Sequence, residues 1–111
     1  MIIDNIQEGL MKWDGVTSGI HRFGGLEFRI GNREMGHVHD DTLADLPFPM
    51  QIRNKLIEEG RASPHHTLPQ SGWVSKGING EEDVRGVIEL FRMQYECLKP
   101  HDKHDKQNNV L

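Results

Sequence analysis

The sequence predicts an α+β domain in which the helices cover one face of a single antiparallel sheet. Three observations predict this fold: short β-like runs between turn residues, apolar residues at helical spacing in three stretches, and a length of 111 residues. The expected order of elements is α-β-β-β-α-β-β-α in one domain over residues 1–98. The polar stretch 99–111 has almost nothing to bury, so we expect a disordered tail there.

The N-terminal half is predicted to hold one helix followed by three strands. Ile2, Ile3, Ile6 and Leu10 recur at helical spacing, which indicates an amphipathic helix over 2–12. The glycine pair that joins the first two strands favours a hairpin, because primed turns need positive φ angles. The three strands are expected at 16–23, 26–30 and 34–40.

The C-terminal half is predicted to hold two helices and two strands. Asp45–Pro49 is expected to open a helix over 48–59, because proline is tolerated in the first helical turn. Acidic residues favour the start of a helix, and the segment after Gly80 begins with three of them. The remaining elements are expected as an edge strand over 63–68, a strand over 73–78 and a helix over 81–98.

Charge and composition narrow the classes of partner. The chain carries a net charge of −4 at pH 7, and its last 13 residues contribute three lysines against two aspartates, which leaves −5 for residues 1–98. A negative net charge disfavours nucleic acid as a binding partner. There is no apolar run of the roughly 18 residues that a membrane span needs, and no signal peptide is visible. The single cysteine, Cys97, fits a reducing compartment, so we expect a cytoplasmic protein.

Strand alternation separates an apolar face from a polar one. Neighbouring residues of a strand point to opposite faces. The apolar side chains expected on the helix-covered face include Val16, Ile20, Leu26, Phe28, Ile30, Val38, Leu68, Val74 and Ile78. The opposite, open face is expected to collect His21, Glu27, Arg29, Met35, His37, His39, His65 and Trp73. Of these, His21, Glu27, Arg29 and Trp73 are the candidates for binding a ligand.

The His37-Val38-His39 segment is the sharpest chemical feature. Residues i and i+2 of one strand lie about 6.6–6.8 Å apart, which allows two imidazoles to converge on one ion. His65, or Glu34 if the strand bulges, would complete a three-ligand site for a divalent transition metal such as zinc. The alternative is that the pair hydrogen-bonds within a solvated face to Asp40, Asp41 or Glu27.

The chain resembles a small family that carries a luciferase-type domain label. The stretches that carry the resemblance are WDGV at 13–16, HRFGGLEFR at 21–29, EMGHVH at 34–39, DLPFP at 45–49, GRA at 60–62, PHH at 64–66 and SGWVS at 71–75. The label implies no particular activity for these residues. The strand that begins with Trp73 and the acidic helix after it are also similar, more distantly, to the MmcQ/YjbR-like fold.

Three functional hypotheses follow. The first is a module that binds a small molecule, a protein partner or a second copy of itself through the open face. The second is a metal-dependent or acid–base enzyme that uses His37, His39 and His65. The third, flavin monooxygenase or luciferase chemistry, rests on the family label alone. No catalytic residue is assigned at this point.

Overall fold

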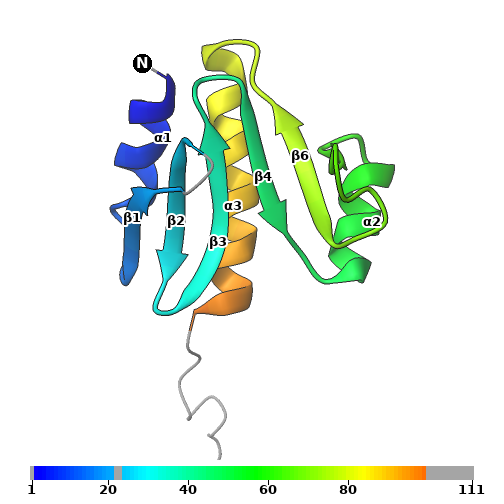
Figure 1. Cartoon of the computed structure of the whole chain (residues 1–111), viewed down its shortest axis with the longest axis horizontal. Helices are drawn as coiled ribbons and strands as arrows, with labels where there is room; N and C mark the ends of the chain where they lie inside the picture. The colour runs from blue at the N-terminus through cyan, green and yellow to red at the C-terminus, as the bar shows by residue number, and fades with distance from the viewer. Residues whose placement is uncertain (1, 22–23, 100–111) are drawn as a thin grey trace, which may run out of the picture.

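The computed structural model describes residues 2–21 and 24–99 of the chain. Among these residues, six antiparallel strands form one sheet in the order β1-β2-β3-β4-β6-β5 (Figure 1). The strands are β1 (Val16–Ile20), β2 (Leu26–Ile30), β3 (Arg33–His39), β4 (Leu43–Pro47), β5 (Ser63–Pro64) and β6 (Trp73–Gly77). This architecture confirms the α+β fold class.

Two helices lie together behind the sheet in the view of Figure 1 and leave its other face open. These are α1 (Ile2–Leu10) and α3 (Val84–Leu98), and α3 is preceded by the 3₁₀ turn η1 (Glu81–Asp83). The third helix, α2 (Met50–Glu58), lies beside the end of the sheet that β6 and β5 form. None of the described helices is long and apolar enough to cross a membrane. Apart from Lys99, the predicted tail lies outside the described residues.

The core lies between the sheet and the helices α1 and α3. Phe28 of β2 meets Phe91 of α3 edge to face, with ring centroids 5.4 Å apart, and both side chains are fully buried. The Tyr95 hydroxyl donates a hydrogen bond of 2.7 Å to the backbone oxygen of Asp14, which ties α3 to the turn after α1. The apolar stripe that predicted the last helix is therefore the stripe that packs against the sheet.

Strand β4 is the main correction to the predicted order. The expected helix start at 45–49 is wrong, because Leu43–Pro47 pairs with β3 on one side and with β6 on the other. Ala44 and Leu46 are fully buried in the core, and the alternation turns Asp45 between them toward the other face. Pro47 stands at the end of the strand, and α2 begins only at Met50.

Three predicted side-chain placements are also wrong. Met35 is fully buried in the core, because a bulge between Phe28 and Arg29 shifts the register of β2 against β3. Leu68 is 50% exposed, since β5 ends at Pro64 and strand alternation does not extend to residue 68. Ile20 is 87% exposed at the end of β1, which is an edge strand with a neighbour on one side only.

Candidate functional site

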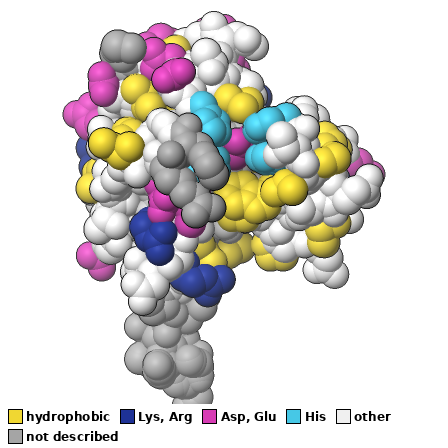
Figure 2. Space-filling model, viewed as in Figure 1, with side chains coloured by type: hydrophobic (Ala, Val, Ile, Leu, Met, Phe, Trp, Pro, Cys, Tyr) yellow, Lys and Arg dark blue, Asp and Glu magenta, His cyan; other side chains and the backbone are white. Residues whose placement is uncertain are grey.

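Histidine side chains gather around an acidic group in a hollow of the open face, as Figure 2 shows. The hollow is a cavity of about 430 Å³. It lies over the middle strands of the sheet and is closed on one side by the segment between β5 and β6. The residues that line it are His21, Glu34, His37, His39, Asp45, His65, His66, Thr67, Leu68 and Trp73.

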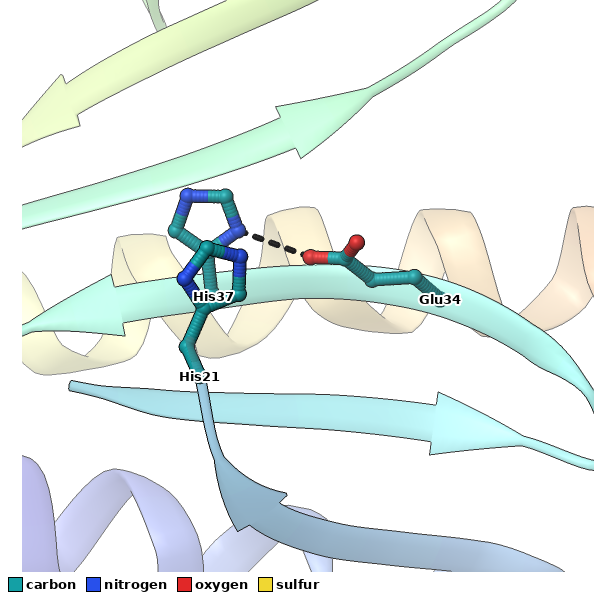
Figure 3. Close-up of side chains that lie close together, drawn as sticks. All are labelled: His21, Glu34 and His37. Carbon is teal, nitrogen blue, oxygen red and sulfur yellow. Dashed lines mark hydrogen bonds and ion pairs between the residues drawn. The ribbon is translucent and has the colours of Figure 1, made fainter. Parts of the chain in front are cut away.

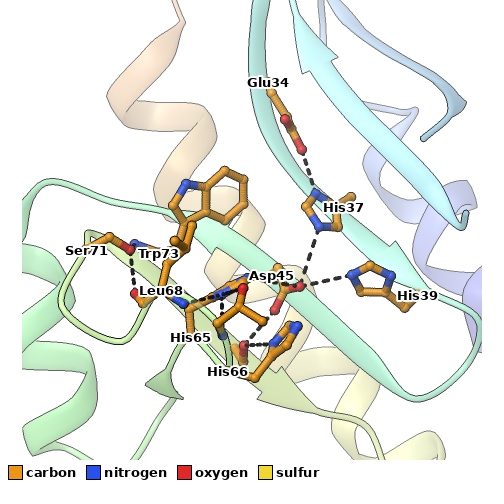
Figure 4. A network of polar contacts seen from close by, with 11 residues as sticks. Glu34, His37, His39, Asp45, His65, His66, Leu68, Ser71 and Trp73 are labelled. Carbon is orange, nitrogen blue, oxygen red and sulfur yellow. Dashed lines mark hydrogen bonds and ion pairs between the residues drawn. The ribbon is translucent and has the colours of Figure 1, made fainter. Parts of the chain in front are cut away.

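Asp45 lies at the centre of this cluster and is fully buried. Its Oδ1 accepts a hydrogen bond of 2.6 Å from the Ser75 hydroxyl. Its Oδ2 lies 3.0 Å from Nε2 of His39 and 3.5 Å from Nε2 of both His37 and His65 (Figure 4). One carboxylate oxygen thus faces three imidazole nitrogens from two separate segments of the chain.

The sheet register brings the members of the cluster together. His37 of β3 pairs with Asp45 of β4, which pairs in turn with Ser75 of β6. Gly36 makes this close approach compatible with the core: a Cβ at this position would lie 2.6 Å from the backbone oxygen of Asp45 and 3.0 Å from the ring of Phe91. Its φ of 154° is also rare for residues with a side chain. Gly36 therefore holds His37 in place.

His37 lies between two carboxylates. Its Nδ1 is 2.7 Å from Oε2 of Glu34, while its Nε2 faces Asp45 (Figure 4). His21 stacks on the same ring at a centroid distance of 4.1 Å (Figure 3). Burial acts to lower the pKa of His37, but the interactions with the carboxylates of Asp45 and Glu34 outweigh it and raise the pKa to about 9.

The pKa values of three neighbouring groups are lowered instead. Burial opposes ionisation of Asp45, but its contacts with His37, Ser75 and His39 hold the pKa of its carboxyl well below the ordinary range. Burial lowers the pKa of His65, and the charge of Asp45 only partly opposes this. Burial and the nearby His37 also lower the pKa of His21. Of these three histidines, His37 is thus the one whose protonated form is favoured.

The cluster contains sets of donor atoms that are close enough to hold a metal ion. In the described part of the chain, three overlapping groups have all their donor atoms within 4.8 Å of one another. These groups are His21, Glu34 and His37; His37, His39 and Asp45; and Asp45, His65 and His66. The second group combines two imidazoles with the fully buried carboxylate.

Most of the residues predicted for the open face do meet in this cavity. His21, His37, His39, His65 and Trp73 all line it. The indole ring of Trp73 has its centroid 5.5 Å from that of His37 and 5.8 Å from that of His65. The cavity therefore has an aromatic wall beside its polar floor.

Glu27 and Arg29 lie apart from this cavity, in an adjoining hollow of about 350 Å³ that shares His21 and Glu34 with it. Their side chains form an ion pair of 2.5 Å. Met35, which was also expected on this face, belongs to the core.

Sequence reasoning missed Asp45 as a site residue. The two prolines that follow it favoured a helix start, although Ala44, Leu46 and Phe48 alternate as a half-buried strand would. A strand there, joined to the preceding one by the short turn at 40–42, would have placed Asp45 opposite the two histidines. That alternation was the available signal.

The comparisons with known proteins give one result at the level of the family. A family model described as Luciferase domain matches residues 32–94. Every residue named above as a neighbour of Asp45 lies within that stretch, whereas His21 precedes it. No curated protein and no solved structure matches the chain. The likeness to the MmcQ/YjbR-like fold stays a prediction.

Proposed function

The chain belongs to the Luciferase domain family, and from this premise we propose that it is a metal-dependent enzyme acting on a small molecule in the histidine-lined cavity. In this proposal His37, His39 and Asp45 hold one divalent transition metal ion. The observation that carries it is the convergence of two imidazole Nε2 atoms on one buried carboxylate oxygen. The substrate would enter from the open face.

The donor distances are compatible with one metal ion after small side-chain adjustments. Nε2 of His39 lies 3.0 Å from Oδ2 of Asp45, and Nε2 of His37 lies 3.5 Å from it. The second distance is long for an N–H···O hydrogen bond. Metal bonds of about 2.0–2.2 Å place neighbouring donors about 2.9–3.4 Å apart, depending on the coordination angle. Small side-chain adjustments would therefore bring both nitrogens and the oxygen to one ion.

In this proposal Glu34 does not bind the metal itself but contacts one of its ligands, His37. Its carboxylate accepts from Nδ1 of His37, which leaves Nε2 of that ring to face Asp45. A carboxylate that fixes the tautomer and orientation of a ligating histidine is a regular feature of metal sites. A site with three protein ligands leaves positions open for water or substrate, as catalytic sites do.

The cavity beside these donors suits a small organic molecule. Its volume of about 430 Å³ lies within the range of roughly 300–1,000 Å³ typical of ligand pockets. Trp73 supplies an apolar wall, and His21, which also lines the cavity, is a further contact. Arg29 and Glu27, in the adjoining hollow, would contact only a ligand that extends beyond the main cavity.

A metal-free acid–base enzyme is the second candidate. The observation that favours it is the position of His37 between the carboxylates of Glu34 and Asp45, an arrangement suited to moving a proton. Flavin or luciferase chemistry stays a hypothesis that rests on the family description, and the absorption spectrum of the purified protein tests it. A module that binds a protein or a second copy through this face would instead cover the exposed Leu68 at the cavity rim.

The decisive experiment is a titration with Co²⁺, a spectroscopic substitute for the native ion. The full chain is purified without a metal-affinity tag and carries His101→Ala and His104→Ala, so that these two imidazoles bind no cobalt. We expect one Co²⁺ per chain with visible absorption. His39→Ala and Asp45→Asn should weaken binding by more than the roughly 10–100-fold that loss of an outer-shell partner costs.

His66→Ala is the matched control. This imidazole is exposed and stacks on His65, but it lies outside the proposed ligand set. Its replacement should leave the affinity for Co²⁺ unchanged. An equal loss in His66→Ala and His39→Ala would overturn the assignment of ligands. The absence of saturable Co²⁺ binding would overturn the metal site and favour the acid–base candidate.

A further inference from the structure

His65 is held by its own loop through one ring nitrogen. Its Nδ1 lies 3.2 Å from the backbone nitrogen of Thr67 and 3.2 Å from that of Leu68, and both N–H groups donate to it. The hydroxyl of Thr67 lies at the same distance. The side chain is 8% exposed, just after the short strand β5. This nitrogen therefore caps the turn that leads the chain over the cavity.

The two backbone donors determine the tautomer of this ring. A backbone N–H can only donate, so Nδ1 of His65 must present its lone pair, and the proton of the neutral ring resides on Nε2. That Nε2–H lies 3.5 Å from Oδ2 of Asp45, longer than a normal hydrogen bond. His65 thus brings a fixed N–H donor to the cavity without a close acceptor for it in this carboxylate.

We propose that His65 is an anion-recognition residue, whose Nε2–H donates a hydrogen bond to an anionic oxygen of the small molecule bound beside the metal. This inference rests on the proposed function, and it sharpens the substrate class to molecules that carry an oxyanion, such as a carboxylate. It also removes His65 from the ligand set, because a nitrogen that carries a proton has no lone pair for a metal. Asp45 takes the third position instead.

The surroundings of His65 suit such a ligand. Metal bound at His37, His39 and Asp45 would offset the negative charge of the carboxylate, which otherwise repels an anion. Trp73, with its ring centroid 5.8 Å from that of His65, would contact the flat body of an aromatic carboxylate. A charge-assisted N–H···O bond is shorter and about twice as strong as a neutral one, so an oxyanion would be preferred over a neutral oxygen.

Two substitutions at His65 separate its two nitrogens. His65→Asn keeps a side-chain oxygen near the position of Nδ1, so the turn retains its acceptor, but it loses the donor. His65→Gln places an amide N–H near the position of Nε2 and so keeps a donor. The probes are benzoate and its neutral analogue benzamide, titrated into the zinc-loaded full chain and followed by tryptophan fluorescence.

We expect benzoate to bind about tenfold or more weakly to His65→Asn than to the wild type, a loss typical of a hydrogen bond to a charged group. His65→Gln should lose less, and benzamide should change little in either variant. Zinc should load equally in all three proteins. Equal benzoate affinity in wild type and His65→Asn would overturn the inference, as would loss of zinc from His65→Asn.

The tautomer itself is measured by two-dimensional ¹H–¹⁵N NMR of the imidazole ring in metal-free protein. We expect the pattern of an Nε2–H ring for His65, and an Nδ1–H pattern would overturn the inference. This readout does not depend on metal. If zinc fails to load while the Nε2–H pattern is found, the proposed metal site fails and the donor assignment for His65 stands.

Discussion

The two faces of the sheet bury their side chains by different means. On the covered face, Phe28 and Phe91 are fully buried because helix α3 lies against the sheet and excludes water from both. On the open face none of the described helices covers β4 (Figure 1), yet Asp45 of this strand is equally buried and is faced by three histidines. Apolar burial is stabilising in itself, whereas a buried charge needs its partners. The covered face therefore supplies the hydrophobic stabilisation, and the open face holds the polar groups on which the proposed function depends.

The largest effect should come from the covered face. Phe91→Ala removes a fully buried ring that meets Phe28 and leaves a cavity, so we expect the free energy of unfolding to fall by about 3–5 kcal/mol. Chemical denaturation of both proteins measures this difference in the free energy of unfolding. Met50→Ala, at a position 46% exposed, is the control and should change stability little. A small effect of Phe91→Ala would contradict the claim that the covered face supplies most of the hydrophobic stabilisation.

Hydrophobic pattern predicted the covered face well. Phe28, Val74, Phe91 and Tyr95 were all placed by alternation or by helical spacing, and all are buried. Such a pattern is local to each element. The apolar face of the helix and that of the strands then pack against each other. The errors, Met35 among them, arise where a bulge or the end of a strand interrupts the alternation.

The open face was predicted only in part, because polar contacts depend on which strands are neighbours. The histidine pair on β3 was found from its spacing, but its central partner Asp45 lies on a strand that the sequence reading took for a helix start. The role of Nδ1 of His65 depends on a turn that brings two backbone N–H groups to one ring nitrogen. The alternation of Ala44, Leu46 and Phe48 could have indicated the strand that carries Asp45, whereas the contact at His65 has no signature in composition or periodicity.

A pH titration sharpens the contrast, because among the described residues the large pKa shifts belong to His37 and Asp45 on the open face. Folding raises the pKa of His37 from 6.5 to about 9, so folding favours its charged form. The stabilisation is complete below pH 6.5 and is lost as the pH rises to about 9. In metal-free protein with chelator, the free energy of unfolding should fall by about 2–3 kcal/mol across this interval.

His37→Gln is the control for this titration, since it removes the titrating ring and should remove the alkaline slope. Asp45 acts in the opposite direction: its pKa is lowered on folding, so its contribution is present above its ordinary pKa of 3.8 and is lost as the pH falls below it. An unfolding free energy that stays constant between pH 6.5 and 9 would show that the charge of His37 does not stabilise the open face.

The smallest effect concerns Glu34, whose carboxylate contacts Nδ1 of His37. In Glu34→Gln the amide can still accept a hydrogen bond but carries no charge, so it orients the ring while making it a weaker ligand. We expect Co²⁺ to bind about tenfold more weakly, as for other outer-shell partners, with the number of bound ions unchanged. In metal-free protein near pH 7, stability should fall by a part of the roughly 2–3 kcal/mol assigned to His37, because Glu34 is one of the two carboxylates that raise the pKa of that ring. Loss of all Co²⁺ binding in this variant would make Glu34 a ligand itself and would move the site toward His21, the third member of that donor group.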